Sequence, residues 1–342
     1  MAINKMDGIR YNENLEYIFE KIAEWSDAME QILRLFSIRI RECFLQANIF
    51  EMFAGELEEI RVRVNQPIEL VTARGAYFLK NDTLVSFPDR QCLSVTAEDL
   101  RQMSTLMSQY SLYAYEEEVR QGFLTVEGGH RIGVCGQVTQ KAGTIGRIYP
   151  ILYLNIRIAR ERKGCGKTVY EQLWKHGEPE NTLVLSAPGT GKTTFLRDLI
   201  RLFSNGDEIH PGKRIGLVDE RSEIAGCLHG IPQNDVGIRT DVLDGCPKVE
   251  GMMLLVRSMA PEILAVDEIG GMEDFFAMQY ALRCGCHLLA TVHAGSLEEL
   301  FQKPGWDKCR DERMFGKYVV ISKEDGKRRY QVKTAGKEDV CF

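Results

Sequence analysis

The sequence lacks the features that define several large classes of protein. None of its ten cysteines forms a CxxC pair, which argues against a disulfide framework or a zinc ribbon and favours a reducing compartment. No apolar run reaches the ~18–20 residues that span a bilayer, because Arg257 and Pro261 interrupt the best candidate, residues 252–266. The first residues contain no apolar segment of a secretory signal, and the chain has no internal repeat or low-complexity tract. These absences predict a cytoplasmic protein that is at most peripheral to a membrane.

Composition sets further limits. The 342 residues are 44% hydrophobic and 27% charged, which is enough for a buried core in about two domains. The 43 basic and 49 acidic residues give a net charge of −6, which argues against a surface that binds nucleic acid as a whole.

Residues 131–167 depart from this acidic balance. Eight basic residues in this segment face a single acidic one, Glu161. Such a segment favours an anionic partner: the phosphates of a nucleotide on an adjacent subunit, nucleic acid or acidic lipid. A solvated basic edge is the alternative. The basic residues are Arg131, Lys141, Arg147, Arg157, Arg160, Arg162, Lys163 and Lys167.

Hydrophobic periodicity divides the chain into three parts. Residues 1–57 show the helical spacing, as at Leu15, Ile18 and Ile22. Residues 58–162 combine period-two segments with one helical pattern, which predicts a small α+β domain. In residues 163–342 short apolar strands alternate with amphipathic helices, which predicts an α/β domain with a mostly parallel sheet. A turn signal at Asp325 and Gly326 predicts a β-hairpin near its end.

The strongest motif lies between a predicted strand at residues 182–185 and a predicted helix at residues 195–203. Its glycines leave backbone N–H groups accessible to phosphate oxygens. Lys192 is expected to contact the β- and γ-phosphates, and the Thr193 hydroxyl is expected to bind Mg²⁺. The first glycine of the usual pattern is replaced by Ser186. A fortuitous glycine-rich loop is the alternative. The predicted nucleotide-binding residues are Ser186, Ala187, Pro188, Gly189, Thr190, Gly191, Lys192, Thr193 and Thr194.

Polar residues follow three further predicted strands. Asp267 and Glu268 end the strand at residues 263–266, where Asp267 is expected to hold Mg²⁺ together with Thr193, and Glu268 to orient or deprotonate the attacking water. His293 follows residues 288–291 and is expected to sense the γ-phosphate. An acidic cluster, residues 219–223, follows residues 215–218. Because ligands bind at the carboxyl ends of strands in open α/β sheets, we expect all four groups to meet in one crevice.

Longer strings resemble a known family. Residues 218–227, 230–244, 251–257 and 266–269, together with 110–115, 120–123, 128–131 and 154–160, closely resemble the stage III sporulation protein AA family of endospore-forming Firmicutes. The likeness covers roughly residues 30–300. That family is in turn similar to the hexameric secretion ATPases of type II and type IV systems.

The resemblance implies a fold, an activity and partners. It implies a RecA-like P-loop domain, ATP and Mg²⁺ as ligands, and ATP hydrolysis that energises a secretion-like channel between mother cell and forespore. It also implies a homo-hexamer docked on membrane proteins of the stage III sporulation channel, at the inner face of the mother-cell membrane around the forespore. Residues 186–194 match the Walker A loop, Asp267 and Glu268 the Walker B end, and residues 291–293 the histidine box.

Two site assignments come from the resemblance alone. The acidic box of these relatives matches residues 219–223, so Glu220 or Glu223 competes with Glu268 as the general base. Arginines of the N-terminal domain are implied to complete the active site between subunits, and the candidates are Arg131, Arg147 and Arg157. A trans arginine would make hydrolysis depend on assembly.

Two other functions stay open. A nucleic-acid-dependent motor would use the basic segment 131–167 as its groove, although no RNA-binding aromatic signature accompanies it. A nucleotide-gated scaffold would bind ATP with little turnover.

Overall fold

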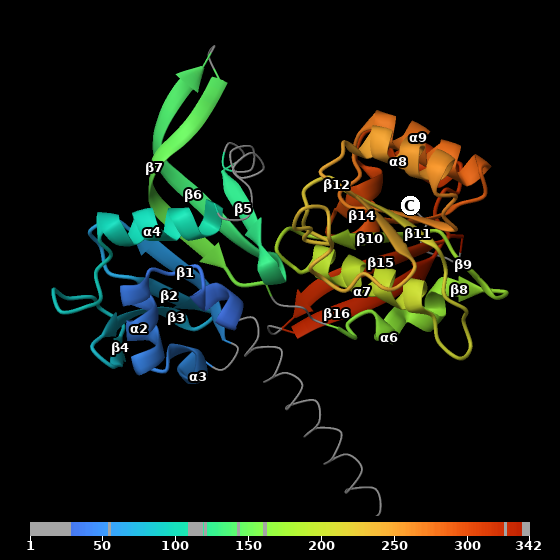
Figure 1. The fold of residues 1–342 in the computed structure, drawn as a ribbon. Helices are drawn as coiled ribbons and strands as arrows, with labels where there is room; N and C mark the ends of the chain where they lie inside the picture. The colour runs from blue at the N-terminus through green and yellow to red at the C-terminus, as the bar shows by residue number, and fades with distance from the viewer. Residues whose placement is uncertain are drawn as a thin grey trace, which may run out of the picture. The chain divides into compact units, whose positions relative to one another are not determined.

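The chain forms two compact units, Met1–Arg160 and Glu161–Phe342 (Figure 1). The computed structural model describes residues 29–53, 56–108, 119, 122–141, 144–159, 163–324 and 327–336. The division falls two residues before the predicted boundary between residues 162 and 163. Within the described ranges, each unit contains one seven-stranded sheet.

The first unit combines short helices with an antiparallel sheet. In the predicted helical segment 1–57, residues 29–33 are helical and two further helices follow them. A strand begins at Leu57. Residues 1–28 lie outside the described part. The elements are α2 (Ile38–Gln46), α3 (Ile49–Phe53), β1 (Leu57–Arg63), β2 (Glu69–Thr72), β3 (Gly75–Lys80), β4 (Thr83–Val85), α4 (Ala97–Ser108), β5 (Phe123–Val126), η1 (Glu127–Gly129), β6 (His130–Lys141) and β7 (Thr144–Arg157).

The sheet of the first unit has one apolar and one polar face. Its strand order is β4-β3-β2-β1-β7-β6-β5, and every neighbouring pair is antiparallel. Ile60, Ile132 and Ile156 alternate with polar residues and pack with α2 and α4 in one core. Arg61 and Arg157 belong to the opposite, polar face. Strands β6 and β7 form a long hairpin that projects past the rest of the sheet (Figure 1).

The second unit contains the predicted mostly parallel sheet. The strand order is β12-β11-β13-β14-β10-β15-β16, and only the last pair, β15 and β16, is antiparallel. The predicted turn at Asp325 and Gly326 joins these two strands and lies outside the described residues. The strands are β8 (Trp174–Lys175), β9 (Glu178–Pro179), β10 (Thr182–Ser186), β11 (Ile215–Asp219), β12 (Thr240–Asp244), β13 (Ile263–Val266), β14 (His287–His293), β15 (Lys317–Glu324) and β16 (Lys327–Thr334).

Helices cover both faces of this sheet, as in a doubly wound α/β fold. In Figure 1, α8 and α9 lie on one face, and α6 and α7 lie on the other. Strand β10 shows the reason: Leu183 and Leu185 join the core with α8 and α9, whereas Val184 joins the core with α7. The helices are α6 (Lys167–Tyr170), η2 (Glu171–Leu173), α7 (Lys192–Asn205), α8 (Lys248–Ser258), α9 (Met272–Arg283), α10 (Leu297–Phe301) and α11 (Trp306–Asp311).

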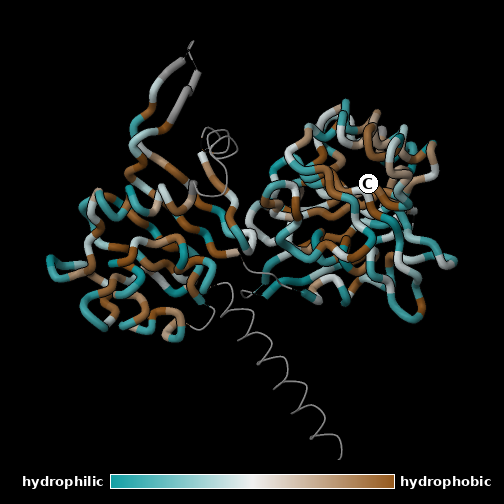
Figure 2. The backbone as a smooth tube through the Cα atoms, in the orientation of Figure 1, coloured by the Kyte–Doolittle hydropathy of each residue, from teal (hydrophilic) through white to brown (hydrophobic). Residues whose placement is uncertain are grey.

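Hydropathy follows this layering. The inner strands of the second unit are largely apolar, and the outer loops are polar (Figure 2). All residues of β10, β11 and β13 are buried, which is the pattern of strands covered on both faces. Across the described ranges, no helix has the length and apolar composition of a membrane span.

The central strand β13 predicts a large packing effect. Leu264 is fully buried in this strand, whereas Leu254 on α8 is 51% exposed. We expect Leu264→Ala to lower the free energy of unfolding by about 3 kcal/mol, because it removes buried methyl groups and leaves a cavity. Leu254→Ala, as the control, should stay within about 1 kcal/mol. Urea unfolding followed by tryptophan fluorescence measures both, since Trp174 and Trp306 are buried in this unit. Equal effects of the two variants would contradict the assignment of Leu264 to the core.

Candidate nucleotide site

The loop between β10 and α7 has the geometry of a phosphate-binding loop. Residues 187–191 follow a fully buried strand, and helix α7 begins at Lys192. Gly189 and Gly191 have φ of 74° and 99°, conformations that side chains with a Cβ rarely adopt. The loop therefore ends at a helix N-terminus, where backbone N–H groups without helical partners favour an anion.

Ser186 closes the base of this loop. Its side chain is fully buried, its hydroxyl donates to the carbonyl of Ala187 at 2.8 Å, and it also contacts the hydroxyl of Thr190. The hydroxyl thus finds its partners inside the loop. This explains how serine is accommodated where the usual pattern has glycine.

Lys192 extends into a group of polar residues from other strands. Its side chain is only 5% exposed, and its Nζ lies 3.5 Å from Glu268 Oε1 and 3.4 Å from both ring nitrogens of His293. Burial lowers the pKa of Lys192, and the nearby carboxylates of Asp267 and Glu268 only partly oppose this effect. A buried ammonium without enough negative charge around it is a suitable site for phosphate oxygens.

Asp267 and Thr193 form the candidate Mg²⁺ position. The Thr193 hydroxyl donates to Asp267 Oδ2 at 3.1 Å, and the Thr291 hydroxyl contacts the other carboxylate oxygen. Among the residues described, no cluster of three or more His, Cys, Asp or Glu side chains could enclose a metal. One carboxylate and one hydroxyl fit Mg²⁺, which keeps most of its ligands as water and substrate phosphates.

Glu268 lies at the centre of a charged network. Its backbone is in the left-handed region, with φ of 55°, and its N–H donates to the Thr291 hydroxyl at 2.9 Å. His293 Nε2 lies 2.8 Å from Oε1, and Arg221 Nη1 lies 3.1 Å from Oε2. Burial alone would raise the pKa of Glu268, but Lys192, His293 and Arg221 together hold it below its ordinary value. Glu268 is therefore a carboxylate, and its orientation is fixed from several sides.

The sheet order explains why these side chains meet. Strand β14 lies between β10 and β13, with His293 opposite Ser186 and Ala290 opposite Val266. Lys192, which follows β10, is therefore only one strand away from Asp267 and Glu268, which follow β13. The convergence predicted for these strand ends is present in the structure.

The acidic cluster after β11 reaches this site through Arg221, whereas Asp219 and Glu220 have other partners. Asp219 is buried and accepts the N–H groups of Glu223, Ile224 and Ala225 at 2.9, 3.0 and 2.8 Å. Burial raises its pKa, although these backbone donors oppose the shift. Glu220 Oε2 lies 3.3 Å from Lys248 Nζ. Of the candidate bases, Glu268 contacts Lys192 and Glu220 pairs with Lys248, while Asp219 holds the loop that carries Arg221.

The candidate arginines belong to the first unit. Arg131 and Arg157 are cross-strand neighbours on β6 and β7. The Arg131 guanidinium lies 4.0 Å from the centre of the Phe123 ring, and Arg157 is 66% exposed with its Nε 3.6 Å from Glu59. Arg147 lies on β7, and its side chain is outside the described part. Of the basic segment 131–167, Arg160 and Arg162 are also outside it, and Lys163 pairs with Asp235 at 3.1 Å.

Several residues near the loop have no role in the sequence interpretation. Arg221 and Thr291 belong to strings that it singled out, so their position at strand ends was a usable signal. Lys248 and Arg328 come from distant segments, and Arg328 contacts Thr190 across 138 positions. No local pattern marks such a contact.

Comparison with known proteins agrees with the geometry. The family model described as sporulation stage III, protein AA matches residues 26–336. Stage III sporulation protein AA of Bacillus subtilis (strain 168) is 41% identical over 271 residues, which cover 79% of this chain and 84% of that protein. The uncharacterized protein ycf45 of Porphyra purpurea is 28% identical over 204 residues, or 59% of this chain and 34% of that protein.

Solved structures share the fold. The pilus retraction motor PilT with bound ADP has a TM-score of 0.55 at 14% identity, covering 85% of this chain and 83% of its own. The Legionella pneumophila ATPase DotB has a TM-score of 0.50 at 14% identity, covering 84% and 79%. The predicted family resemblance and the predicted RecA-like fold are confirmed.

The charge network predicts a specific pH dependence. The pKa of Glu268 is lower in the folded chain than its ordinary value of 4.5, so its ionised form stabilises the fold at neutral pH. We expect Glu268→Gln to lower the free energy of unfolding by about 1 kcal/mol at pH 7. This difference from the parent should shrink as the pH falls from 4.5 through the folded pKa, because Glu268 then becomes neutral in both states. Urea unfolding of both proteins at pH 7 and pH 3.5 tests it. A difference that grows at low pH would contradict the sign of the shift.

Proposed function

The chain belongs to the stage III sporulation protein AA family, and from this membership we propose that it is a Mg²⁺-dependent ATPase of the secretion-ATPase type. The observation that carries the proposal is the convergence of Lys192, Thr193, Asp267, Glu268 and His293 beside a glycine-rich loop at a helix N-terminus. These are the parts that binding and hydrolysis of a nucleoside triphosphate require.

The reaction is assigned to residues of this unit. Backbone N–H groups of residues 189–194 bind the phosphates, and Lys192 neutralises the β- and γ-phosphate oxygens. Glu268 orients a water molecule toward the γ-phosphorus and accepts its proton as the bond to the ADP oxygen breaks. His293 contacts Glu268 in the structure and is assigned to sensing the γ-phosphate. Thr193 and Asp267 would hold Mg²⁺, which neutralises charge on the phosphates.

Glu268 is favoured as the base over Glu220 and Glu223. Its contact with Lys192 would place it near the γ-phosphate, whereas Glu220 pairs with Lys248. Phosphate oxygens would compete with Glu268 for Lys192. Nucleotide binding would thus draw Lys192 away from the Glu268 carboxylate and leave it with His293 and Arg221.

The assembly is also part of the proposal. A homo-hexamer would let Arg131, Arg147 or Arg157 of one subunit reach the nucleotide of the next. The polar sheet face that carries Arg157, which is 66% exposed, supports such a contact. The membership supports a place at the mother-cell membrane around the forespore, on membrane proteins of the stage III channel.

Steady-state ATP hydrolysis against protein concentration, with the mass measured at each point, tests this function. We expect specific activity to rise as oligomers form, and chelation of Mg²⁺ to abolish it. Lys192→Ala should weaken ATP binding at least about tenfold, and Glu268→Gln should slow hydrolysis about 100-fold. Arg157→Ala should slow hydrolysis at least about 100-fold, whereas Arg101→Ala, an exposed arginine on α4 of the same unit, should not.

Two results would overturn the proposal. Hydrolysis that needs single-stranded DNA or RNA at physiological salt would favour a nucleic-acid-dependent motor. Stable ATP-bound rings without turnover, unchanged by Glu268→Gln, would favour a nucleotide-gated scaffold.

A further inference from the structure

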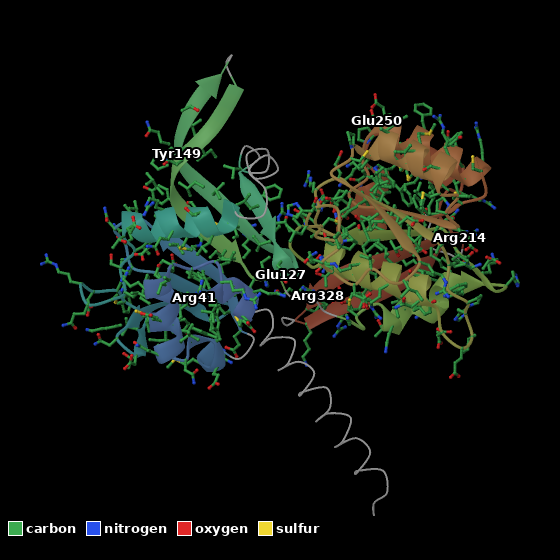
Figure 3. The ribbon with its side chains drawn as sticks, in the orientation of Figure 1. Arg41, Glu127, Tyr149, Arg214, Glu250 and Arg328 are labelled. Atoms are coloured by element: carbon green, nitrogen blue, oxygen red, sulfur yellow. The ribbon has the colours of Figure 1, made fainter. Side chains whose placement is uncertain are left out.

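A residue from the end of the second unit lies against the phosphate loop. Arg328 of β16, which is labelled in Figure 3, donates its Nε hydrogen to the carbonyl of Thr190 at 2.6 Å. Its guanidinium also fills the space beside Gly191, where a Cβ would come within 2.6 Å of a terminal nitrogen. Gly191 is favoured by its φ, and the absence of a Cβ leaves room for the guanidinium in this position.

A second contact fixes the same strand to helix α7. The rings of Tyr330 and Phe195 are stacked, with centroids 4.7 Å apart and planes 16° from parallel. Arg328 and Tyr330 are two residues apart and share a face of the strand. Gly191 and Phe195 are four apart and share a face at the start of the helix. Strand β16 is therefore held at two points against the first turn of α7.

The sheet order indicates which end of a nucleotide Arg328 would meet. Lys192, Glu268 and His293 gather on the side of β10 that carries β14 and β13. Strands β15 and β16 lie on the other side of β10. A triphosphate with its terminal phosphate at Lys192 would therefore direct its nucleoside end toward β16.

We propose that Arg328 binds the α-phosphate at the nucleoside end of the bound nucleotide. The inference rests on the proposed function, since it needs the loop to hold a nucleotide. The guanidinium carries five N–H donors in a plane, and the bond to Thr190 uses one of them. Arg328 is also exposed on the strand, so a ligand can reach it. The geometry assigns the last strand of the sheet to the nucleotide site.

Nucleotide affinity separates this binding role from a purely structural one. Dissociation constants for ADP would be measured by calorimetry for the parent, R328Q, R328K and R329Q. We expect R328Q to weaken ADP binding about 10- to 100-fold, because a charge-assisted hydrogen bond is lost. R328K keeps the charge and should lose less affinity. R329Q is the matched control, since Arg329 is 70% exposed and pairs with Glu324 at 2.9 Å.

Each other outcome has a definite meaning. ADP affinity of R328Q within twofold of the parent, with a lower melting temperature in the absence of nucleotide, would overturn the inference and leave Arg328 as a brace of the loop. Equal losses of ADP affinity in R328K and R328Q would overturn the α-phosphate contact, because the positive charge that R328K retains should still attract a phosphate. The proposed function fails separately: if the parent binds no nucleotide, or binds it as Lys192→Ala does, both proposals fall.

Discussion

The position of β14 between β10 and β13 decides which side chains meet at the phosphate loop. The register places His293 beside Ser186, and Thr291 within reach of Asp267 and of the Glu268 backbone. A shift of one residue along β14 would turn Thr291 and His293 to the opposite face. The buried apolar residues of the same strand, Leu288 to Ala290 before Thr291 and Val292 after it, oppose that shift. The packing of the core therefore fixes the register of β14, and this register fixes the geometry of the site.

Electrostatics adds a second layer to the same arrangement. A nearly buried ammonium is costly unless negative charge lies close by, and Glu268 meets that need of Lys192 only in part, because the pKa of Lys192 stays lowered. Glu268 in turn is shared with Arg221 and His293. The loop that carries Arg221 is shaped by Asp219, a buried carboxylate with three backbone donors. The charged side chains at the ends of β11, β13 and β14 are therefore in direct contact with one another and are not spread over a surface.

Much of this arrangement can be predicted from the sequence, because it depends on local signals. The glycine pattern before Lys192, the carboxylates after residues 263–266 and the polar end at His293 each follow an apolar strand, and parallel strands bring such ends to one edge. The roles of Ser186 and Asp219 inside their loops need coordinates, because they depend on hydrogen bonds to the backbone. Lys248 and Arg328 need the strand order and tertiary contacts. The arginine candidates Arg131, Arg147 and Arg157 need a relation between copies of the chain, which a single chain does not contain.

Strand β16 also has a consequence for association. It is one of the two outer strands of the sheet, and outer strands with unpaired backbone groups can add strands from other molecules. Lys327, Arg328, Arg329 and Lys333 give this strand a dense positive charge. Like charges oppose the pairing of two β16 edges, so the strand resists adding a second copy of itself. The same stretch of basic residues can thus oppose aggregation through this edge and also supply the arginine beside the phosphate loop.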